Sequence, residues 1–251
     1  MSGALQQLDA FRYLWLEQML EFRTTWTWSL MFGVLMPMAM VFGLPRIGGG
    51  AIDQVGLIYI VSGAAVFAVA TEGITTLAQR IGVIKKDGMI QYYASLPISP
   101  ASFLAAVVLS RLVLIMPGLL TPVLAGVLFY DADLVLSPAL LLVLPLTCLS
   151  LSAIGLAIGT FVDSMELIVV ITNLMIFVLL LASPVLIPIE ALPLPLQLLG
   201  QVLPPTYAAS ALRLALAGDL GAAFVVDVVV LIGLAVLGLL VAARCIRWRV
   251  A

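Results

Sequence analysis

The sequence predicts an all-α membrane protein with a single domain over residues 1–251: an amphipathic helix at the membrane surface, followed by six transmembrane helices. Two observations predict this fold. Hydrophobic residues make up 64% of the 251 residues and charged residues 10%, whereas a soluble globular domain is about half apolar and a quarter charged. The few charges also divide the chain into apolar intervals close to the roughly 20 residues that a helix needs to cross the hydrocarbon core. The composition therefore excludes an ordinary water-soluble domain.

Residues 1–24 predict a helix that lies in the membrane surface on the cytoplasmic side. With 100° between successive residues, bulky apolar side chains form one stripe, and Glu17 and Glu21 lie on the other side. The stripe consists of Leu8, Phe11, Trp15, Met19, Phe22 and Trp26. Its aromatic rings suit the headgroup boundary. This favours a membrane contact over the alternative, a soluble helix packed on another protein.

Six apolar intervals predict the spans, and a seventh is interrupted. The predicted spans are residues 25–44, 55–78, 101–130, 138–162, 166–187 and 221–244. The seventh interval lies within residues 188–218, where Pro193, Pro195, Pro204 and Pro205 break a continuous helix, because proline lacks a backbone donor and its ring clashes with the preceding turn. We expect broken, re-entrant helices on the extracellular side, which either shorten an outer loop or shape an outward exit.

Basic residues indicate that both termini are cytoplasmic. The chain has 11 Lys and Arg residues, and with both termini inside, only Arg46 and Arg213 fall on the outside. Arg111 is then expected at the inner boundary of its span. An excess of basic residues on the cytoplasmic side is the rule for membrane proteins. We therefore expect an N-in, C-in topology and, most simply, a bacterial or archaeal plasma membrane.

The residue inventory excludes several classes of chemistry. The chain has no histidine, which removes the commonest general base and zinc ligand, and we expect no metal site. A net charge of −2 gives no support for binding nucleic acid. No GxxxxGKS/T motif occurs, so the phosphate-binding loop that would hold ATP is absent from the sequence. An intramembrane enzyme would need clustered acids, or a nucleophile beside a base, and the sequence predicts neither.

Glu72 is an acidic residue embedded in a predicted span. A carboxylate inside a membrane segment is a functional candidate by default. We expect Glu72 near the cytoplasmic end of the second span, within reach of water or Arg80. Because a single carboxylate makes a poor proton relay, we favour a structural or pairing role over proton coupling.

The longest cytoplasmic connection, residues 79–100, predicts a docking surface. From residue 85 it reads KKDGMIQYYASLPISP, a charged start followed by a short amphipathic helix. Gly88 permits a tight bend, and the Leu96-Pro97 pair stops the helix. Exposed apolar side chains among charges generally mark a partner site; a plain connector between two helices is the alternative.

Together these features resemble the integral membrane subunits of type-2 ATP-binding-cassette (ABC) exporters. The loop resembles the family's basic-acidic-glycine pattern at residues 86–88 and its Leu-Pro-Ile-Ser ending at residues 96–99, with Gln91 where the pattern usually has glutamate. The outer region resembles the family's series of proline, Pro-Thr-Tyr, Leu-Arg and glycine, found here at Pro188, Pro193, 205–207, 212–213 and Gly218. The resemblance covers essentially the whole chain.

The resemblance implies a permease that does not itself hydrolyse ATP. Residues 79–100 would hold a coupling helix seated on a separate ABC ATPase subunit, which binds ATP and Mg, so no cofactor is expected in this chain. Two copies of that subunit would serve two permeases, in a homodimer or a heterodimer surrounded by membrane lipids. The implied ATPase contact comprises Lys85, Lys86, Asp87, Gly88, Met89, Gln91, Tyr92 and Tyr93, with Glu17 and Glu21 beside them.

The resemblance also implies a pathway lined chiefly by the first, second and fifth spans. Candidate pathway residues are Trp28, Phe32, Met36, Tyr59, Phe67, Thr71, Thr172, Asn173 and Phe177, and candidate extracellular gate residues are Pro188, Pro193, Pro205, Tyr207 and Arg213. This mostly apolar lining suits export of a hydrophobic or amphipathic substrate: a drug, a lipid or a lipid-linked glycan. Small residues such as Gly155 and Gly159 allow close helix packing, within one subunit or between two.

An ion-gradient-driven secondary transporter is the main alternative. That class ordinarily shows inverted repeats, with interrupted helices at matching positions in both halves. In this chain the interruptions are concentrated after the fifth span. A membrane-anchored scaffold without transport activity is a further alternative.

Overall fold

The computed structural model describes residues 2–47, 53–95, 100–130, 134–135, 137–182, 185, 193–201 and 203–245, and its account of side chains leaves out 2–10 and 21–32 in particular. Within these residues every regular element is an α-helix, which confirms the predicted all-α class. In chain order the helices are α1 (Ser2–Ile47), α2 (Gln54–Lys86), α3 (Met89–Ser95), α4 (Pro100–Tyr130), α5 (Leu140–Phe161), α6 (Met165–Ala182), α7 (Leu194–Gly200), α8 (Pro204–Ala217) and α9 (Ala222–Cys245).

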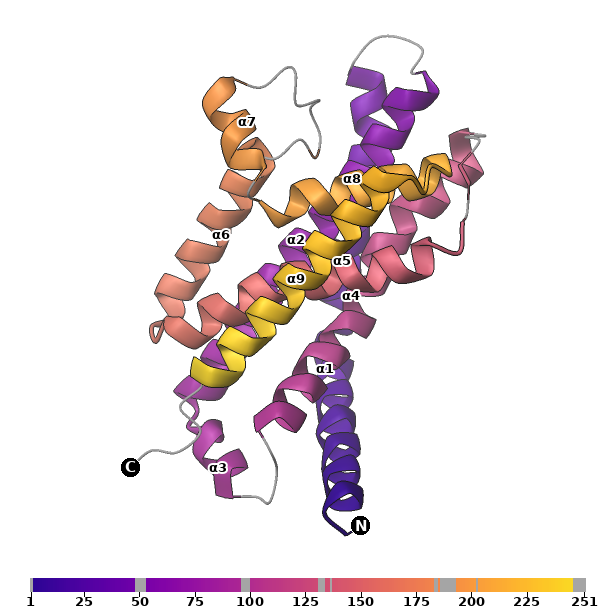
Figure 1. The fold of residues 1–251 in the computed structure, drawn as a ribbon. Coiled ribbons are helices and arrows are strands. Elements are labelled where there is room, and N and C mark those ends of the chain that lie inside the picture. The colour runs from indigo at the N-terminus through magenta and orange to yellow at the C-terminus, as the bar shows by residue number, and fades with distance from the viewer. Residues whose placement is uncertain are drawn as a thin grey trace.

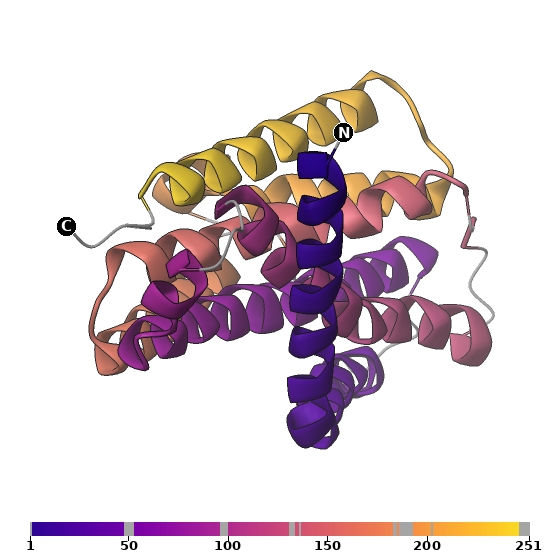
Figure 2. The ribbon, with the colours of Figure 1, turned by 90° about the horizontal axis from the view of Figure 1, so that it is seen from below.

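The helices form a tilted bundle around α2 and α5. α2 packs against α1, α4, α5, α6 and α8, while α9 lies along α5 and α8. Figure 1 shows the first turn of α1, α3 and the last turn of α9 at one end of the bundle, the α3 end; α7 and α8 lie at the opposite end, the α8 end. Viewed from below, α1 crosses the direction of the other long helices (Figure 2), and its main neighbour is α4.

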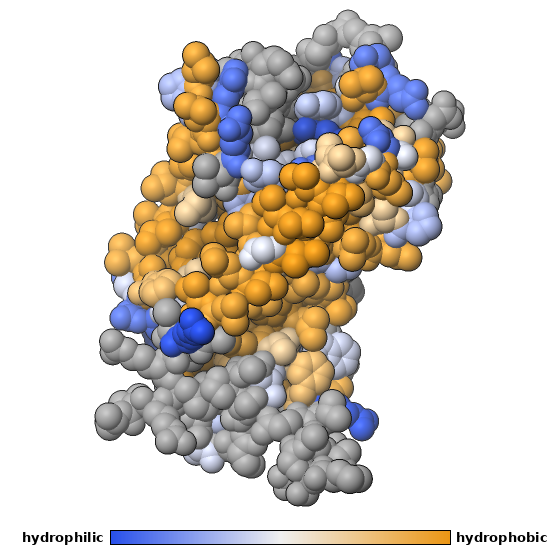
Figure 3. Space-filling model, in the orientation of Figure 1, coloured by the Kyte–Doolittle hydropathy of each residue, from blue (hydrophilic) through white to orange (hydrophobic). Residues whose placement is uncertain are grey.

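The described helices have the apolar length of a multi-pass membrane protein. Four are long and apolar enough to cross the hydrocarbon core: Gln54–Lys86, Ser102–Tyr130, Leu140–Phe161 and Ala222–Ala242. Two shorter apolar stretches, Gly33–Arg46 and Met165–Leu179, accompany them, and all six overlap the predicted spans. Figure 3 shows hydrophobic residues across the middle of the face in view, over α9 above all. So broad an apolar surface requires a covering in water, and lipid provides it.

α1 is one uninterrupted helix of 46 residues. We expected a separate interface helix over residues 1–24 and a span over residues 25–44, and the structure has no helix break between them. Residues 21–32 contain neither glycine nor proline, so nothing in that stretch stops helix propagation. The N-terminal amphipathic stripe and the first apolar stretch therefore belong to the same element.

α2 continues to Lys86, whereas the second span was expected to end at residue 78. Apolar side chains recur at helical spacing beyond that point, and Ile81 and Ile84 are buried. The helix ends where the backbone N–H of Asp87 donates to the carbonyl of Val83 at 2.9 Å. Gly88 follows with a φ of 68°, in the left-handed region that glycine tolerates. The predicted bend at Gly88 is confirmed, and the expected loop is shorter because residues 79–86 are helical.

Prolines and a glycine delimit the two short helices at the α8 end. α7 carries Pro195 in its first turn, and α8 begins with a Pro-Pro pair, positions where the missing proline N–H has no intrahelical partner to lose. Gly218 ends α8 at a φ of 76°, a left-handed cap. The predicted interruption of this apolar interval is therefore confirmed.

Glycines bring α5 close to α2. A Cβ added at Gly159 would lie 2.7 Å from the carbonyl oxygen of Ala78, closer than van der Waals contact allows. Gly155 in the same way abuts the backbone at Ile74. The sequence left open whether these glycines pack helices within one subunit or between two subunits. Both pack α5 against α2 within one chain.

Candidate coupling surface and transport region

α3 is held on one side and open on the other. Its spacing places Met89, Ile90 and Tyr93 on one face, where they pack with a cluster that includes Leu14 of α1 and Phe103 of α4. The opposite face is exposed, and the side chain of Tyr92 is 60% accessible. This amphipathic arrangement fixes the position of a short helix that could not be stable alone.

Tyr93 joins α3 to both neighbouring helices. Its hydroxyl donates to Oε1 of Glu17 on α1 at 2.7 Å, and its ring centroid lies 4.8 Å from that of Phe103. Tyr93 is 1% accessible. Two residues expected to contact an ATPase, Tyr93 and Glu17, thus also contact each other.

Lys85 also faces inward. Its Nζ donates to the carbonyl oxygens of Gly159, Thr160 and Val162 at 3.3, 3.0 and 2.9 Å. It also forms an ion pair with Asp163 at 2.5 Å. Lys85 therefore caps the C-terminus of α5, a role that the sequence did not indicate because the partners lie 74 to 77 positions away.

The exposed residues of this region form a polar and aromatic patch. Four residues predicted to contact an ATPase are exposed, and we call them the α3 surface: Lys86, Asp87, Gln91 and Tyr92. Gly88 and Met89 are half-buried at its edge. The side chain of Glu21 lies outside the described residues. The α3 surface is a compact set of charge, amide and phenol groups available to another protein.

Arg80 links α2 to α1. It is buried, and its Nε donates to Oε1 of Gln18 at 3.2 Å. We expected Arg80 to be a possible partner of Glu72, but this bond directs it to α1. The two bonded residues are 62 positions apart, so no local sequence pattern connects them.

Glu72 lies deeper in the bundle than expected, because α2 runs a further 14 residues to Lys86, or about 21 Å. Its side chain adjoins α1, where a Cβ added at Gly33 would lie 3.7 Å from its Oε1. Arg111 of α4 attracts the carboxylate electrostatically. Arg111 was expected at the inner boundary and instead lies well inside α4. The carboxylate of Glu72 therefore lies within electrostatic reach of a basic residue on a neighbouring helix.

Arg213 anchors α8 to the rest of the bundle. Its Nε donates to Oγ of the buried Ser62 at 3.0 Å, and its Nη2 donates to the carbonyl of Val185 at 2.7 Å. Its guanidinium lies 3.6 Å from the ring centroid of Tyr59, a cation–π contact. The structure thus brings together one predicted gate residue, Arg213, and one predicted pathway residue, Tyr59.

Side-chain bonds join α8 to the end of α7. The hydroxyl of Tyr207 donates to the carbonyl of Gln201, and Oγ1 of Thr206 donates to the carbonyl of Gly200, both at 2.5 Å. Both acceptors lie at the C-terminal end of α7, where the last carbonyls have no donor within the helix; the Gly200 carbonyl also accepts from the N–H of Leu203 at 3.1 Å. Of the other predicted gate residues, Pro193 is exposed at the start of α7, and Pro188 lies outside the described residues.

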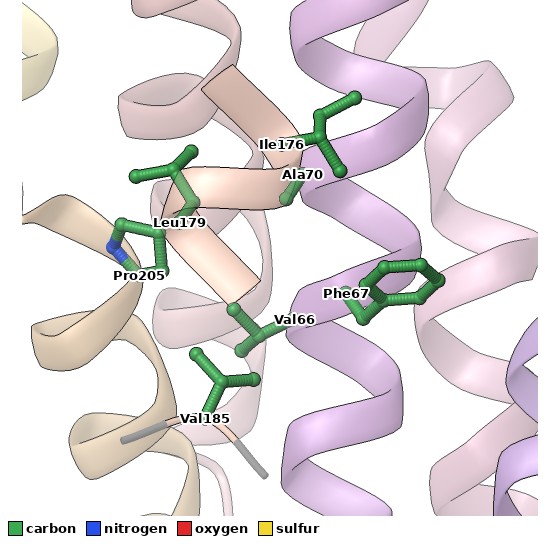
Figure 4. Close-up of a pocket in the computed structure, with 7 residues that line it drawn as sticks. All are labelled: Val66, Phe67, Ala70, Ile176, Leu179, Val185 and Pro205. Atoms are coloured by element: carbon green, nitrogen blue, oxygen red, sulfur yellow. The ribbon is translucent and has the colours of Figure 1, made fainter. Parts of the chain in front are cut away.

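Pro205 and Phe67 line an apolar pocket where α2, α6 and α8 meet (Figure 4). The other lining residues are Val66, Ala70, Ile176, Leu179 and Val185. Figure 4 shows Leu179 and Pro205 facing each other from α6 and α8. The pocket volume of about 10 Å³ is roughly that of one water molecule. It is therefore a gap between packed helices and too small for a substrate.

Other predicted pathway residues point away from the bundle. Met36 and Phe177 are 57% and 58% accessible. Asn173 is exposed as well, and its amide donates to the carbonyl of Val169 at 2.7 Å. The described part of one chain does not gather these residues around a common chamber.

The two predicted pathway threonines bond within their own helices. The hydroxyl of Thr71 donates to the carbonyl of Phe67 at 3.0 Å, and that of Thr172 donates to the carbonyl of Ile168 at 2.8 Å. The side chains of Trp28 and Phe32 lie outside the described residues. Among residues that the structure describes, no three His, Cys, Asp or Glu side chains are grouped to hold a metal ion.

Comparison with known proteins adds a family match. Residues 9–217 match the family model described as ABC-2 type transporter. The match begins about two turns into α1 and ends with α8, so it leaves out α9. It contains both the α3 surface and Arg213. No curated protein matches the chain.

Proposed function

Because this chain belongs to the ABC-2 type transporter family, and is thus an ABC transporter permease, we propose that it forms the membrane-spanning half of an ATP-driven exporter. A separate ATPase subunit would bind ATP and Mg and supply the energy. Two permeases, identical or different, would assemble with two such subunits in a bacterial or archaeal plasma membrane. The substrate would be hydrophobic or amphipathic: a drug, a lipid or a lipid-linked glycan.

The observation that carries this proposal is the construction of α3. A protein powered by another subunit needs a surface that the partner can reach and a rigid connection from that surface to the spans. The α3 surface offers the first, with Tyr92 and Gln91 exposed. Tyr93 offers the second, because its bond to Glu17 and its ring contact with Phe103 join α3 to α1 and α4. The partner would therefore move both helices through α3.

The pathway would lie between two permease copies. Met36, Asn173 and Phe177 are exposed on one copy, and the pocket lined by Phe67 accommodates no more than about one water molecule. A second copy facing these residues would enclose a mostly apolar lining with a few polar groups, Asn173 among them. Such a lining favours an amphipathic substrate over a free sugar.

The proposal predicts that Tyr92→Glu uncouples the complex. We would co-express the chain with its candidate ATPase subunit, purify the assembly and measure vanadate-sensitive ATP hydrolysis. A complex with two copies of each subunit is expected, and Tyr92→Glu should abolish the stimulation by the permease, because it places a carboxylate where an aromatic ring packs on the partner. Gln201→Glu adds the same charge at the exposed end of α7 and should leave stimulation intact.

Two results would contradict the proposal. Stimulated hydrolysis that survives Tyr92→Glu would show that α3 is not the contact. Transport by the chain without any ATPase subunit, driven by an ion gradient, would favour the secondary-transporter alternative, with Glu72 and Arg111 as its first candidates.

A further inference from the structure

Lys85 connects the bend between α2 and α3 with the turn between α5 and α6. Its main chain lies in the last turn of α2, and its carbonyl accepts from the N–H of Gly88 at 3.2 Å in the bend that leads to α3. Its side chain reaches across to the last carbonyls of α5 and to Asp163, in the turn between α5 and α6. The connection that carries α3 is therefore fastened to the other helix connection at the same end of the bundle.

The chemistry of this fastening is that of a helix C-cap. The last carbonyls of a helix have no intrahelical donors, and the helix dipole makes that end negative. A lysine ammonium supplies three donors and a positive charge. At 19% accessibility, the Lys85 side chain is largely shielded, whereas the Asp163 side chain is 90% accessible. The carbonyl bonds therefore contribute more than the exposed ion pair.

Packing fastens the start of α6 to the same stretch of α2. A Cβ added at Gly82 would lie 2.6 Å from Cδ1 of Ile168, so α6 lies against α2 one turn before Lys85. Ile168 is buried. The end of α5, the turn and the first turns of α6 thus all contact the last two turns of α2.

We propose that Lys85 is a positioning residue that makes the α5–α6 turn move with α3. This inference rests on the proposed function, because the displacement begins when the ATPase subunit pushes on the α3 surface. α2 and its bend carry the displacement, and the Lys85 ammonium transfers it to α5 and to α6. α6 bears Thr172, Asn173 and Phe177, so the transfer would reach the predicted pathway. A cap with a merely structural role would stabilise α5 and transfer nothing.

The first test measures the connection itself in the assembled complex. Spin labels at Ser95→Cys, the exposed last residue of α3, and at Glu166→Cys report the separation of α3 from the turn in a chain whose own cysteines are replaced by alanine. We expect one narrow distance distribution that is the same without nucleotide and after vanadate trapping. Lys85→Gln should broaden it and make it change on trapping. Arg12→Gln removes the same charge from an exposed position on α1, outside the α3 surface, and should leave the distribution narrow.

The second test measures coupling. Lys85→Gln should keep the complex and its basal hydrolysis but lower substrate stimulation about tenfold or more, the change expected when charge-assisted hydrogen bonds are lost. In the K85C/D163C double variant, a bifunctional thiol cross-linker should restore stimulation, and cleaving the linker should remove it again. This variant also tests the inference if Lys85→Gln fails to fold, because a purely stabilising cap would not respond to reversible cross-linking.

The outcomes separate the two proposals. If the unsubstituted chain forms no complex with an ATPase, the proposed function fails. If the complex forms and is stimulated, but Lys85→Gln keeps full stimulation and a narrow, unchanged distance, Lys85 does not transfer motion. Loss of stimulation that cross-linking cannot restore would equally overturn the inference.

Discussion

At the residue scale, Arg213 shows how much a single side chain can hold in place. It connects α8 with Ser62 and Tyr59 of α2 and with the carbonyl of Val185. Its place in a Leu-Arg pair after Pro-Thr-Tyr was visible in the sequence. Its partners were not, because Ser62 lies 151 positions away and hydroxyl groups carry no local pattern that marks them as acceptors.

Arg213→Ala should lower the free energy of unfolding by about 2 kcal/mol, because it leaves a buried hydroxyl and a carbonyl without their donor. Arg213→Lys should recover only part of this loss, since an ammonium lacks the planar fork that bonds two acceptors and stacks on a ring. Thermal unfolding in detergent measures both changes. Arg244→Ala, which removes an exposed arginine, is the control; equal losses for all three variants would remove the anchoring role.

Glu72 tests the choice between proton coupling and charge pairing. We expect Glu72→Gln to leave transport and its pH profile intact and to lower the free energy of unfolding by about 1 kcal/mol, the upper end of the range for loosely paired charges. The physical reason is that Arg111 then loses its counter-charge. Combined with Arg111→Gln, the loss should be smaller than the sum of the single losses. Abolished transport with unchanged stability would instead support a proton relay.

At the scale of the element, the sequence predicted where helices are broken better than where they continue. Prolines and Gly218 delimit α7 and α8 because their effects on the backbone are local. The boundary expected at residue 24 does not exist, since charged residues mark a membrane surface without stopping a helix. α2 likewise continues beyond its apolar interval. The side chains of Arg80 and Lys85 form hydrogen bonds to other helices, so these charged residues do not have to reach water for the helix to continue.

Two glycine-to-alanine changes test whether α2 and α5 depend on close approach. Gly159→Ala should lower the free energy of unfolding by about 2 kcal/mol, because its methyl group would meet the Ala78 carbonyl and force the helices apart. Gly233→Ala, on α9 with nothing within 4 Å of the added Cβ, should be neutral or raise stability by up to about 1 kcal/mol. Unfolding midpoints of the two variants give the comparison, and similar midpoints would contradict it.

At the scale of the whole molecule, the sequence predicted the class of fold and the placement of α3 with the first turn of α1, and the structure has both. It could not predict which side chains of α3 are open. Lys85 and Tyr93 are the same residue types as Lys86 and Tyr92 of the α3 surface, yet the side chains of Lys85 and Tyr93 form bonds within the chain. Burial depends on which helices meet, and the helices that surround these residues come from distant parts of the sequence.

Two glutamines test the orientation of the molecule. Gln91 is exposed on α3 and Gln201 is exposed beyond α7, at opposite ends of the bundle (Figure 1). In a chain whose own cysteines are replaced by alanine, Gln201→Cys should react with a membrane-impermeant thiol reagent added to intact cells. Gln91→Cys should react only after the membrane is opened, because the basic residues near it favour the cytoplasm.

The reverse labelling pattern would be decisive against the coupling role. ATP is available in the cytoplasm, so an ATPase subunit must dock there. If Gln91→Cys reacted in intact cells, the α3 surface would face away from every such subunit, and neither Tyr92 nor Lys85 could receive its motion. Labelling of both positions in intact cells would instead mean that the chain inserts in two orientations, and the excess of basic residues near the α3 end would then not fix its topology.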